Sequence, residues 1–424
     1  MSSVIIFYEI LSREYPACDK IRKILEEKHN HKVGVFSIIY EYYKAINFAK
    51  KNGVDCVVMP WLREEENYAA MKHFVEINNK VILCNFSHEQ IASDETCELY
   101  IPKTEEIKNK VFHFCWGEHF KDLIVRNGVN SKNAVVTGNS RLDFKYECKM
   151  NRETLAKEFN LDLNKKWILF AESRDWVLDD CNLETRIQQG LDEALEKESY
   201  EWSKKYLEEI YAQLNELDEK FFERFEFIYR PHPSCSNPKG ITNPNVKVTA
   251  NYSIYEWLKN CDYYISSAST SAFEAESMGK PVVCFEIKDM PKTFKTYGLE
   301  NYIQINHLSS IDDKLFEKAL KVTNGQNIFA KYVGVCDGKN CERTADIIDE
   351  LLNSNIDFVH KKVKDCANNN NMPTKFRSLI KNMLMSLGLV RLVKSKEWCS
   401  LAYKDCPFTR TNKKMYGIKN ETRK

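Results

Sequence analysis

The sequence predicts two doubly wound, Rossmann-like α/β domains facing a cleft, followed by a basic C-terminal helical tail. Short apolar segments alternate with longer helix-like segments through most of the chain, which is typical of parallel sheets covered on both faces. The length of 424 residues exceeds that of one ordinary domain. From Ile356 onward, 16 Lys and Arg stand against 5 Asp and Glu, a local balance of +11. We therefore expect domains at residues 1–150 and 165–355, and the tail at 356–424.

In the first domain, each expected strand is a short apolar run and each expected helix has apolar residues at helical spacing. The strands are Val4–Tyr8, Lys32–Phe36, Asp55–Met59, Lys80–Cys84, Val111–Cys115 and Ala134–Thr137. The helices are Cys18–Glu27, Tyr40–Lys51 and Glu64–Asn78. We interpret the charged segment Lys145–Lys166 as a linker.

The second domain repeats this alternation. Its expected strands are Trp167–Ala171, Phe225–Tyr229, Val246–Val248, Asp262–Ser266, Pro281–Phe285 and Ile303–Ile305. Leu183–Phe222, which is rich in Glu, Lys and Leu, is expected to form two helices. Two further helices are expected over Asp312–Val322 and Cys341–Asn353. Two such domains joined by a linker create a cleft, which is a usual place for a ligand.

The composition excludes several classes of protein. Hydrophobic residues make up 43% of the chain and aromatic residues 12%, which excludes global disorder. The net charge is +1, so residues before the tail carry an acidic excess, which argues against a nucleic-acid partner. The fifteen cysteines include no CxxC pair, and their odd number favours reduced thiols. Without a basic leader or an apolar run of about eighteen residues, we expect a cytoplasmic protein.

The tail has a pattern of its own. After the Asn-rich connector 367–373, apolar residues recur at helical spacing between basic ones: Phe376, Leu379, Ile380, Met383, Leu384 and Leu387. Such a stripe is typical of a helix lying on an anionic membrane. We favour this interpretation, which places the protein peripherally at the inner face of the cell membrane. The alternative is a helix that packs its stripe on the protein body.

Two segments that follow expected strands indicate an anion site. The expected strand Phe225–Tyr229 is followed by Arg230-Pro231-His232-Pro233. The expected strand Asp262–Ser266 ends in Ser266-Ser267-Ala268-Ser269-Thr270-Ser271, which leads into a helix. Ligands of open α/β sheets bind outside the carboxyl ends of the strands, and helix N-termini attract anions. Separately, the segments are also compatible with a rigid turn and an ordinary N-cap. Together they favour a phosphate-bearing ligand, most economically a nucleotide.

These segments resemble motifs of GT-B glycosyltransferases that build bacterial surface carbohydrates and capsules. Arg230-Pro231-His232-Pro233 is similar to the His-Pro motif of capsule sialyltransferases, capsular 3-deoxy-octulosonic acid transferases and teichoic-acid glycerophosphotransferases. The Ser-rich segment with Glu274-Ala275 and Gly279-Lys280-Pro281-Val282 resembles their Ser-Ser motif. Cys115-Trp116-Gly117, Gly138-Asn139-Ser140-Arg141 and Ser12-Arg13-Glu14 resemble segments of surface carbohydrate biosynthesis proteins, although Ser140 stands where those carry Pro.

The resemblance, which covers about residues 1–350, implies roles for these side chains. It implies phosphate or nucleotide binding by Arg230, His232, Ser266, Ser267, Ser269, Thr270 and Glu274. For the base that deprotonates the acceptor hydroxyl, we expect His88 ahead of Glu89. The segment Phe86-Ser87-His88-Glu89 departs from the Trp-His-Gly motif of the glycerophosphotransferases. The alternative is that it is a structural loop. Weaker candidates for the cleft or acceptor side are Arg13, Glu14, Asn139 and Arg141. Glu274 could equally be a first-turn acid of its helix.

The resemblance implies transfer of a sugar from a nucleotide-activated donor, with CMP or CDP favoured, to a surface polysaccharide, capsule, lipopolysaccharide or other lipid-linked glycan. We expect no metal or other cofactor, because no Asp-x-Asp lies near the proposed phosphate site and no His/Cys cluster has ligand spacing. Two alternatives remain open. One is an epimerase that acts on UDP-N-acetylglucosamine, and the other is a non-catalytic nucleotide- or glycan-binding subunit.

Overall fold

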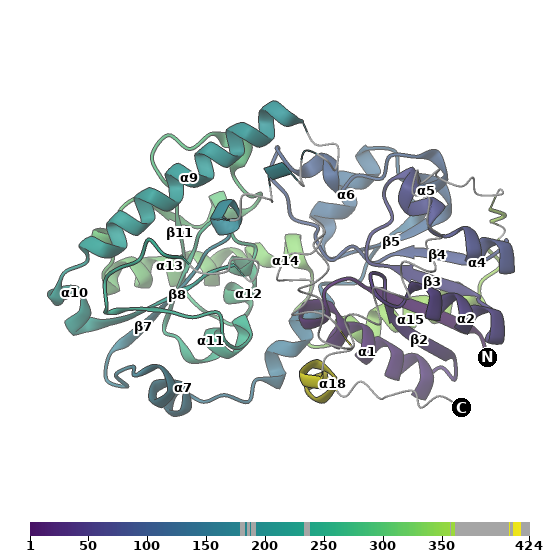
Figure 1. The fold of residues 1–424 in the computed structure, drawn as a ribbon, viewed down its shortest axis with the longest axis horizontal. Helices are drawn as coiled ribbons and strands as arrows, with labels where there is room; N and C mark the ends of the chain where they lie inside the picture. The colour runs from purple at the N-terminus through teal and green to yellow at the C-terminus, as the bar shows by residue number, and fades with distance from the viewer. Residues whose placement is uncertain are drawn as a thin grey trace. The chain divides into compact units, whose positions relative to one another are not determined.

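The computed structural model describes residues 1–178, 183–184, 187, 192–232, 238–356, 358–360, 407 and 410–416. The chain forms two units, each with a parallel six-stranded sheet and flanking helices (Figure 1). All strand pairs are parallel. The prediction of two doubly wound α/β domains is therefore confirmed.

The sheet of the first unit has the order β2-β1-β3-β4-β5-β6. Its strands are β1 (Ser3–Tyr8), β2 (Lys32–Ser37), β3 (Cys56–Met59), β4 (Ile82–Asn85), β5 (Val111–Cys115) and β6 (Ala134–Val136). Its helices are α1 (Leu11–Glu27), α2 (Tyr42–Asn52), α3 (Glu65–Ala69), α4 (Lys72–Ile77), α5 (Glu105–Lys110), α6 (Glu118–Arg126), α15 (Asn340–Asn353) and α18 (Arg410–Tyr416). The inward side chains of β1, β3 and β4 form a core with those of α2 and α4.

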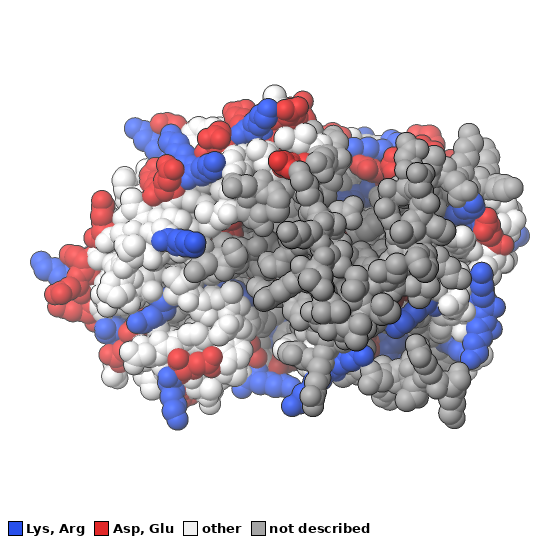
Figure 2. Space-filling view, in the orientation of Figure 1, with Lys and Arg blue, Asp and Glu red and all other residues white. Residues whose placement is uncertain are grey.

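The sheet of the second unit has the order β12-β11-β10-β7-β8-β9. Its strands are β7 (Lys166–Ala171), β8 (Phe225–Arg230), β9 (Val246–Val248), β10 (Tyr263–Ser266), β11 (Val282–Phe285) and β12 (Ile303–Ile305). Its helices are α7 (Arg152–Phe159), α9 (Glu193–Glu216), α10 (Glu219–Arg224), α11 (Ile254–Asn260), α12 (Ser271–Ser277), α13 (Asp313–Gln326) and α14 (Ile328–Val333). Figure 2 shows acidic and basic side chains mixed along α9, as on a solvated helix face.

Helix α1 begins seven residues before the expected Cys18. The first helical bonds run from the N–H groups of Arg13 and Glu14 to the carbonyl of Ile10. Pro16 lies inside the helix, in its second turn, where it removes one intrahelical N–H donor. The earlier start places Arg13 and Glu14 in the first helical turn, directly after β1.

Two segments do not belong to the unit that their position in the sequence would suggest. Residues 334–353 pack in the first unit, and residues 91–99 in the second. Helix α15 pairs with the end of α1, where Lys28 Nζ lies 2.9 Å from an Asp346 oxygen, and Figure 1 shows it among the elements of the first unit. At Gly334, where φ is +79°, a Cβ would lie 2.3 Å from the Trp116 carbonyl oxygen. The predicted second domain at 165–355 did not include this return.

The segment Lys145–Lys166, which we interpreted as a weakly structured linker, is part of the second unit. It contains α7, whose N-cap Asn151 accepts a hydrogen bond from the Thr154 N–H. Arg152 donates to Asp262 at 2.9 Å and lies 4.1 Å from the centroid of the Trp167 ring. These contacts fix the segment against the start of β7, so it is more ordered than the weakly structured linker that we expected.

Most of the predicted tail, including the stripe Phe376–Leu387, lies outside the described residues. Within the described part, α18 brings the Tyr416 ring to 6.1 Å from that of Tyr15 on α1. None of the helices described has the length and apolar character needed to cross a membrane.

Candidate functional site

The strand order of the second unit reverses beside β7. The chain passes from β7 to β8 and β9 on one side of the sheet, and then to β10 and β11 on the other side. The carboxyl ends of β7, β8 and β10 therefore lie together around a topological switch point, where ligands of open α/β sheets bind. Both sequence motifs start at these ends, at Arg230 and at Ser266.

The serine loop after β10 is folded on itself. Ser266 Oγ accepts from the Ser269 N–H at 3.1 Å and donates to the Ser269 carbonyl at 2.9 Å. Ala268 between them has a φ of +52°, an uncommon conformation for a residue with a Cβ. Ser266 and Ser267 are fully buried, whereas Ser269 and Thr270 are half-buried. The first two serines therefore shape the loop, whereas Ser269 and Thr270 remain partly accessible.

Glu172, directly after β7, is a residue that the sequence analysis missed. Its Oε1 accepts from Ser267 Oγ at 2.7 Å and from the N–H groups of Ser173 and Arg174. Its Oε2 is buried and has no hydrogen-bond partner among the described residues. Burial raises the pKa of Glu172. An acidic residue at the carboxyl end of a predicted strand was the signal that could have identified it.

The two polar side chains of the Arg-Pro-His segment, Arg230 and His232, lie in different environments. The Arg230 guanidinium donates to the carbonyls of Asn251 and Tyr252, at 2.9 and 2.7 Å, and burial lowers its pKa to about 10. Arg230 therefore braces the loop after β9. The His232 side chain is exposed, while its backbone N–H donates to Asp175 at 2.9 Å. Of the two, His232 is the side chain presented to solvent.

Glu274 lies in the first turn of α12 and is half-buried. It accepts from the Tyr255 hydroxyl at 3.2 Å, and its charge acts on the Arg230 guanidinium. This carboxylate therefore lies among the polar side chains at the switch point.

In the first unit, the segments after β1 and β4 bring together four of the predicted residues. Arg13 donates to Glu89 through Nη1 and to Glu14 through Nη2, the latter at 2.8 Å. Glu14 Oε2 also accepts from the N–H of Glu9 at 2.7 Å and of Ile10 at 3.3 Å. Burial acts to raise the pKa of Glu14, but the electrostatic interactions with His88 and Arg13 and the hydrogen bonds from Arg13 and the Glu9 N–H outweigh it and lower that pKa. The Glu14 carboxylate is thus an ionised centre of the cluster.

His88 lies inside this cluster. It is 5% exposed, and its Nε2 is 3.7 Å from Glu14 Oε2, without a hydrogen-bond partner among the described residues. Burial lowers the pKa of His88 to about 4, and the nearby positive charges of Arg13 and Arg141 add to the shift. The imidazole is therefore neutral near pH 7 and can accept a proton, with Glu14 close enough to stabilise the resulting cation.

The remaining candidates, Asn139 and Arg141, follow β6. Asn139 Oδ1 accepts from the Arg141 N–H at 3.1 Å, so it fixes the turn that presents the arginine. The Arg141 guanidinium stacks over Trp116, with 4.9 Å from its central carbon to the ring centroid. The first unit thus brings Arg13, Glu14, His88 and Glu89 into one group and places the charge of Arg141 beside it.

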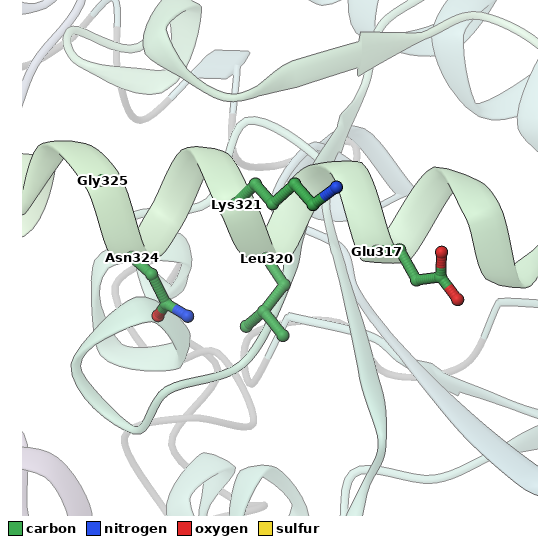
Figure 3. Close-up of a pocket in the computed structure, with 5 residues that line it drawn as sticks. All are labelled: Glu317, Leu320, Lys321, Asn324 and Gly325. Carbon is green, nitrogen blue, oxygen red and sulfur yellow. The ribbon is translucent and has the colours of Figure 1, made fainter.

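Two other features lie apart from these groups. The described residues that line a shallow hollow of about 530 Å³ all belong to α13: Glu317, Leu320, Lys321, Asn324 and Gly325 (Figure 3). No described strand end contributes to this lining. Among the residues that the structure describes, no group of three or more His, Cys, Asp and Glu side chains is arranged to hold a metal ion.

Comparison with known proteins identifies the fold. No family model matches the sequence, and no curated protein matches it significantly. The structure is similar to that of S. aureus MnaA with UDP (TM-score 0.52, 15% identity, 83% of this chain and 97% of that one). It is also similar to a putative UDP-N-acetylglucosamine 2-epimerase from Listeria monocytogenes (0.50, 13%, 86% and 99%). A third similar structure is the wall teichoic acid polymerase TagF (0.52, 13%, 82% and 89%). The chain therefore has a GT-B-like fold of two α/β domains.

Proposed function

We propose that this protein is a glycosyltransferase that moves a sugar from a nucleotide-activated donor to a surface polysaccharide or lipid-linked glycan. One observation carries the proposal. The serine loop and the Arg-Pro-His segment, which resemble the motifs of such enzymes, follow the two strands on either side of β7, at the switch point of the second unit. CMP- and CDP-linked donors are favoured because the motifs resemble those of enzymes that use them. The similar structures named above are S. aureus MnaA with UDP, a putative UDP-N-acetylglucosamine 2-epimerase and a wall teichoic acid polymerase.

In this proposal the second unit binds the nucleotide. His232, exposed at the end of β8, donates a hydrogen bond to phosphate, and the half-buried hydroxyls of Ser269 and Thr270 add donors. Glu172 holds Ser267 in place and so keeps the loop in its folded form. These groups stabilise the negative charge that develops on the departing phosphate.

The first unit supplies the base. His88 removes the proton from the acceptor hydroxyl as the oxygen attacks the anomeric carbon, and the bond from that carbon to the phosphate oxygen breaks. The proton resides on Nε2, where the Glu14 carboxylate at 3.7 Å stabilises it. Arg13 ties Glu14 to Glu89 and so orients the cluster.

A second candidate function is epimerisation of a UDP-linked sugar. The likeness to MnaA with UDP and to a putative UDP-N-acetylglucosamine 2-epimerase favours it. The carboxylates near His88 favour it as well, because they suit proton transfer at carbon. Incubation with UDP-N-acetylglucosamine alone distinguishes the two functions. A 2-epimer formed without an acceptor would overturn the transferase proposal, whereas nucleotide release that requires an acceptor supports it.

Replacing His232 by alanine is expected to weaken nucleotide binding by about 10- to 150-fold, because one charge-assisted hydrogen bond to phosphate is lost. The fold should remain intact, since the side chain is exposed. Calorimetric titration with CDP and UDP measures the effect. His307→Ala, at another loop of the same unit, is the control. Unchanged affinity in the His232 variant would remove this residue from the site.

We further propose that the basic tail holds the protein at the inner face of the membrane, near a lipid-linked acceptor. Each Lys or Arg near an anionic surface contributes about 1 kcal/mol, and salt screens this attraction. Full-length protein is expected to sediment with anionic liposomes at low salt, and protein truncated at Asp365 is not. Equal sedimentation of the two proteins, or none by either, would contradict the proposal and favour docking of the tail on the body, where α18 already contacts α1.

A further inference from the structure

Arg141 packs on an aromatic ring, and no acidic side chain among the described residues pairs with it. Its guanidinium lies over Trp116, which is 3% exposed, and its buried Nε has no acceptor in the described part of the chain. Across the described ranges, its guanidinium makes no hydrogen bond, whereas its backbone N–H donates to Asn139. A partly desolvated cation that lacks an anionic partner is costly, unless a ligand supplies the anion.

The neighbouring Arg13 shows the contrast. Both of its terminal nitrogens are used, one by Glu14 and the other by Glu89. The Nε atoms of both arginines lack a partner among the described residues, but only Arg141 also has unpaired terminal nitrogens there. Both cations act on His88. A guanidinium presents five N–H donors in a planar fork that matches a carboxylate or a phosphate, so the unused donors suit an oxyanion.

The position of Arg141 relative to His88 is fixed by the surrounding backbone. The Trp116 N–H donates to Gln90 Oε1 at 2.6 Å, and Gln90 Nε2 donates to the carbonyls of Ser87 and Phe114. Gln90 therefore ties the ring beneath Arg141 to the loop that carries His88.

The segment 334–353 also supports this arrangement, through contacts with Asn139 and Trp116. Asn340 Nδ2 donates to the Asn139 carbonyl at 3.0 Å, and Gly334 packs directly against the Trp116 carbonyl. Because the stacking ring and the turn are both fixed, little ordering remains to be done when a ligand binds, which favours affinity.

From this arrangement we infer that the acceptor carries an oxyanion, a carboxylate or a phosphate, and that Arg141 stacked on Trp116 binds it beside His88. The inference rests on the proposed function and adds the chemical class of the acceptor. An oxyanion there also offsets the positive charge that lowers the pKa of His88, so the proposed base becomes stronger when the acceptor is bound.

Three probes that share a sugar ring test the inference: glucose, glucuronate and glucose 6-phosphate. Each is titrated into the full-length protein by ligand-observed NMR. We expect at least one of the two anionic probes to bind about tenfold or more tightly than glucose, and the better of them identifies the oxyanion. Arg141→Gln should remove this preference. The control Arg126→Gln, which deletes the same charge from an exposed position on α6, should retain it.

Equal or undetectable binding of all three probes by wild-type protein would overturn the inference, as would a preference that survives in folded Arg141→Gln. If that variant does not fold, Arg141→Lys keeps the charge without the planar fork, and the preference should fall severalfold; an unchanged preference would again overturn the inference. CDP and UDP titrations of the same samples separate the two claims. Nucleotide binding without anion preference defeats this inference alone, whereas absence of nucleotide binding defeats the proposed function.

Discussion

Replacing His88 by glutamine is expected to lower the rate of sugar transfer by about 10²- to 10⁴-fold, the usual contribution of a general base. Glutamine fills similar space but cannot take a proton. The affinity for the nucleotide should stay near that of the wild type, because the proposed nucleotide site lies on the other unit. Release of nucleotide from the donor, with a membrane extract as the source of acceptor, measures the rate.

The matched control is His113, a buried histidine of the same unit. Burial lowers its pKa to about 4 as well, and its ring nitrogens contact Asn85 and the Ile107 carbonyl, so its role is structural. His113→Gln is expected to reduce stability and leave the rate per folded molecule unchanged. If folded His88→Gln retains more than a tenth of the wild-type rate, His88 is not the base.

Replacing Glu14 by alanine is expected to lower the free energy of unfolding by about 3–5 kcal/mol, the usual result of removing one partner of a buried charge pair. The fully buried carboxylate accepts from two backbone N–H groups at the start of α1 and from Arg13. Its loss leaves those donors unpaired in a water-excluded region. Urea unfolding followed by circular dichroism measures the change.

Asp19 on the same helix provides the control. It pairs with Arg22 and Lys23 at the surface, where ion pairs contribute at most about 1 kcal/mol. Asp19→Ala should therefore destabilise the protein only slightly. Equal, small losses for both variants would show that Glu14 does not organise the cluster around His88.

The stability contributed by Glu14 should also depend on pH. Since the pKa of this carboxylate is lowered in the folded protein, its contribution is present above the ordinary glutamate range and is lost as the pH falls through the folded value. This loss should be absent from an acid titration of the Glu14→Ala variant.

The sheet strands and the positions of the motifs could be predicted from the sequence. A buried parallel strand is a short apolar run, so segments such as Trp167–Ala171 and Phe225–Tyr229 correspond closely to β7 and β8. Residues that follow such runs necessarily lie at the carboxyl edge of a parallel sheet. This explains why His88, Arg230 and Ser266 were found at strand ends.

What the side chains do there could not be predicted, because it depends on partners distant in sequence. Arg230 is occupied by carbonyls of residues 251 and 252, and Ser267 by Glu172, 95 positions away. The return of α15 to the first unit depends on pairing with α1, and the apolar pattern of α15 does not specify it. The early start of α1 was hidden by Pro16, which ordinarily marks a helix boundary.

The most direct test of the proposed function is calorimetric titration of the full-length protein with CMP, CDP and UDP. We expect saturable binding of at least one of them, with one site per chain, and weaker binding in His232→Ala. A folded protein that binds none of the three nucleotides would contradict a nucleotide site at the switch point of the second unit, and with it the proposed sugar transfer.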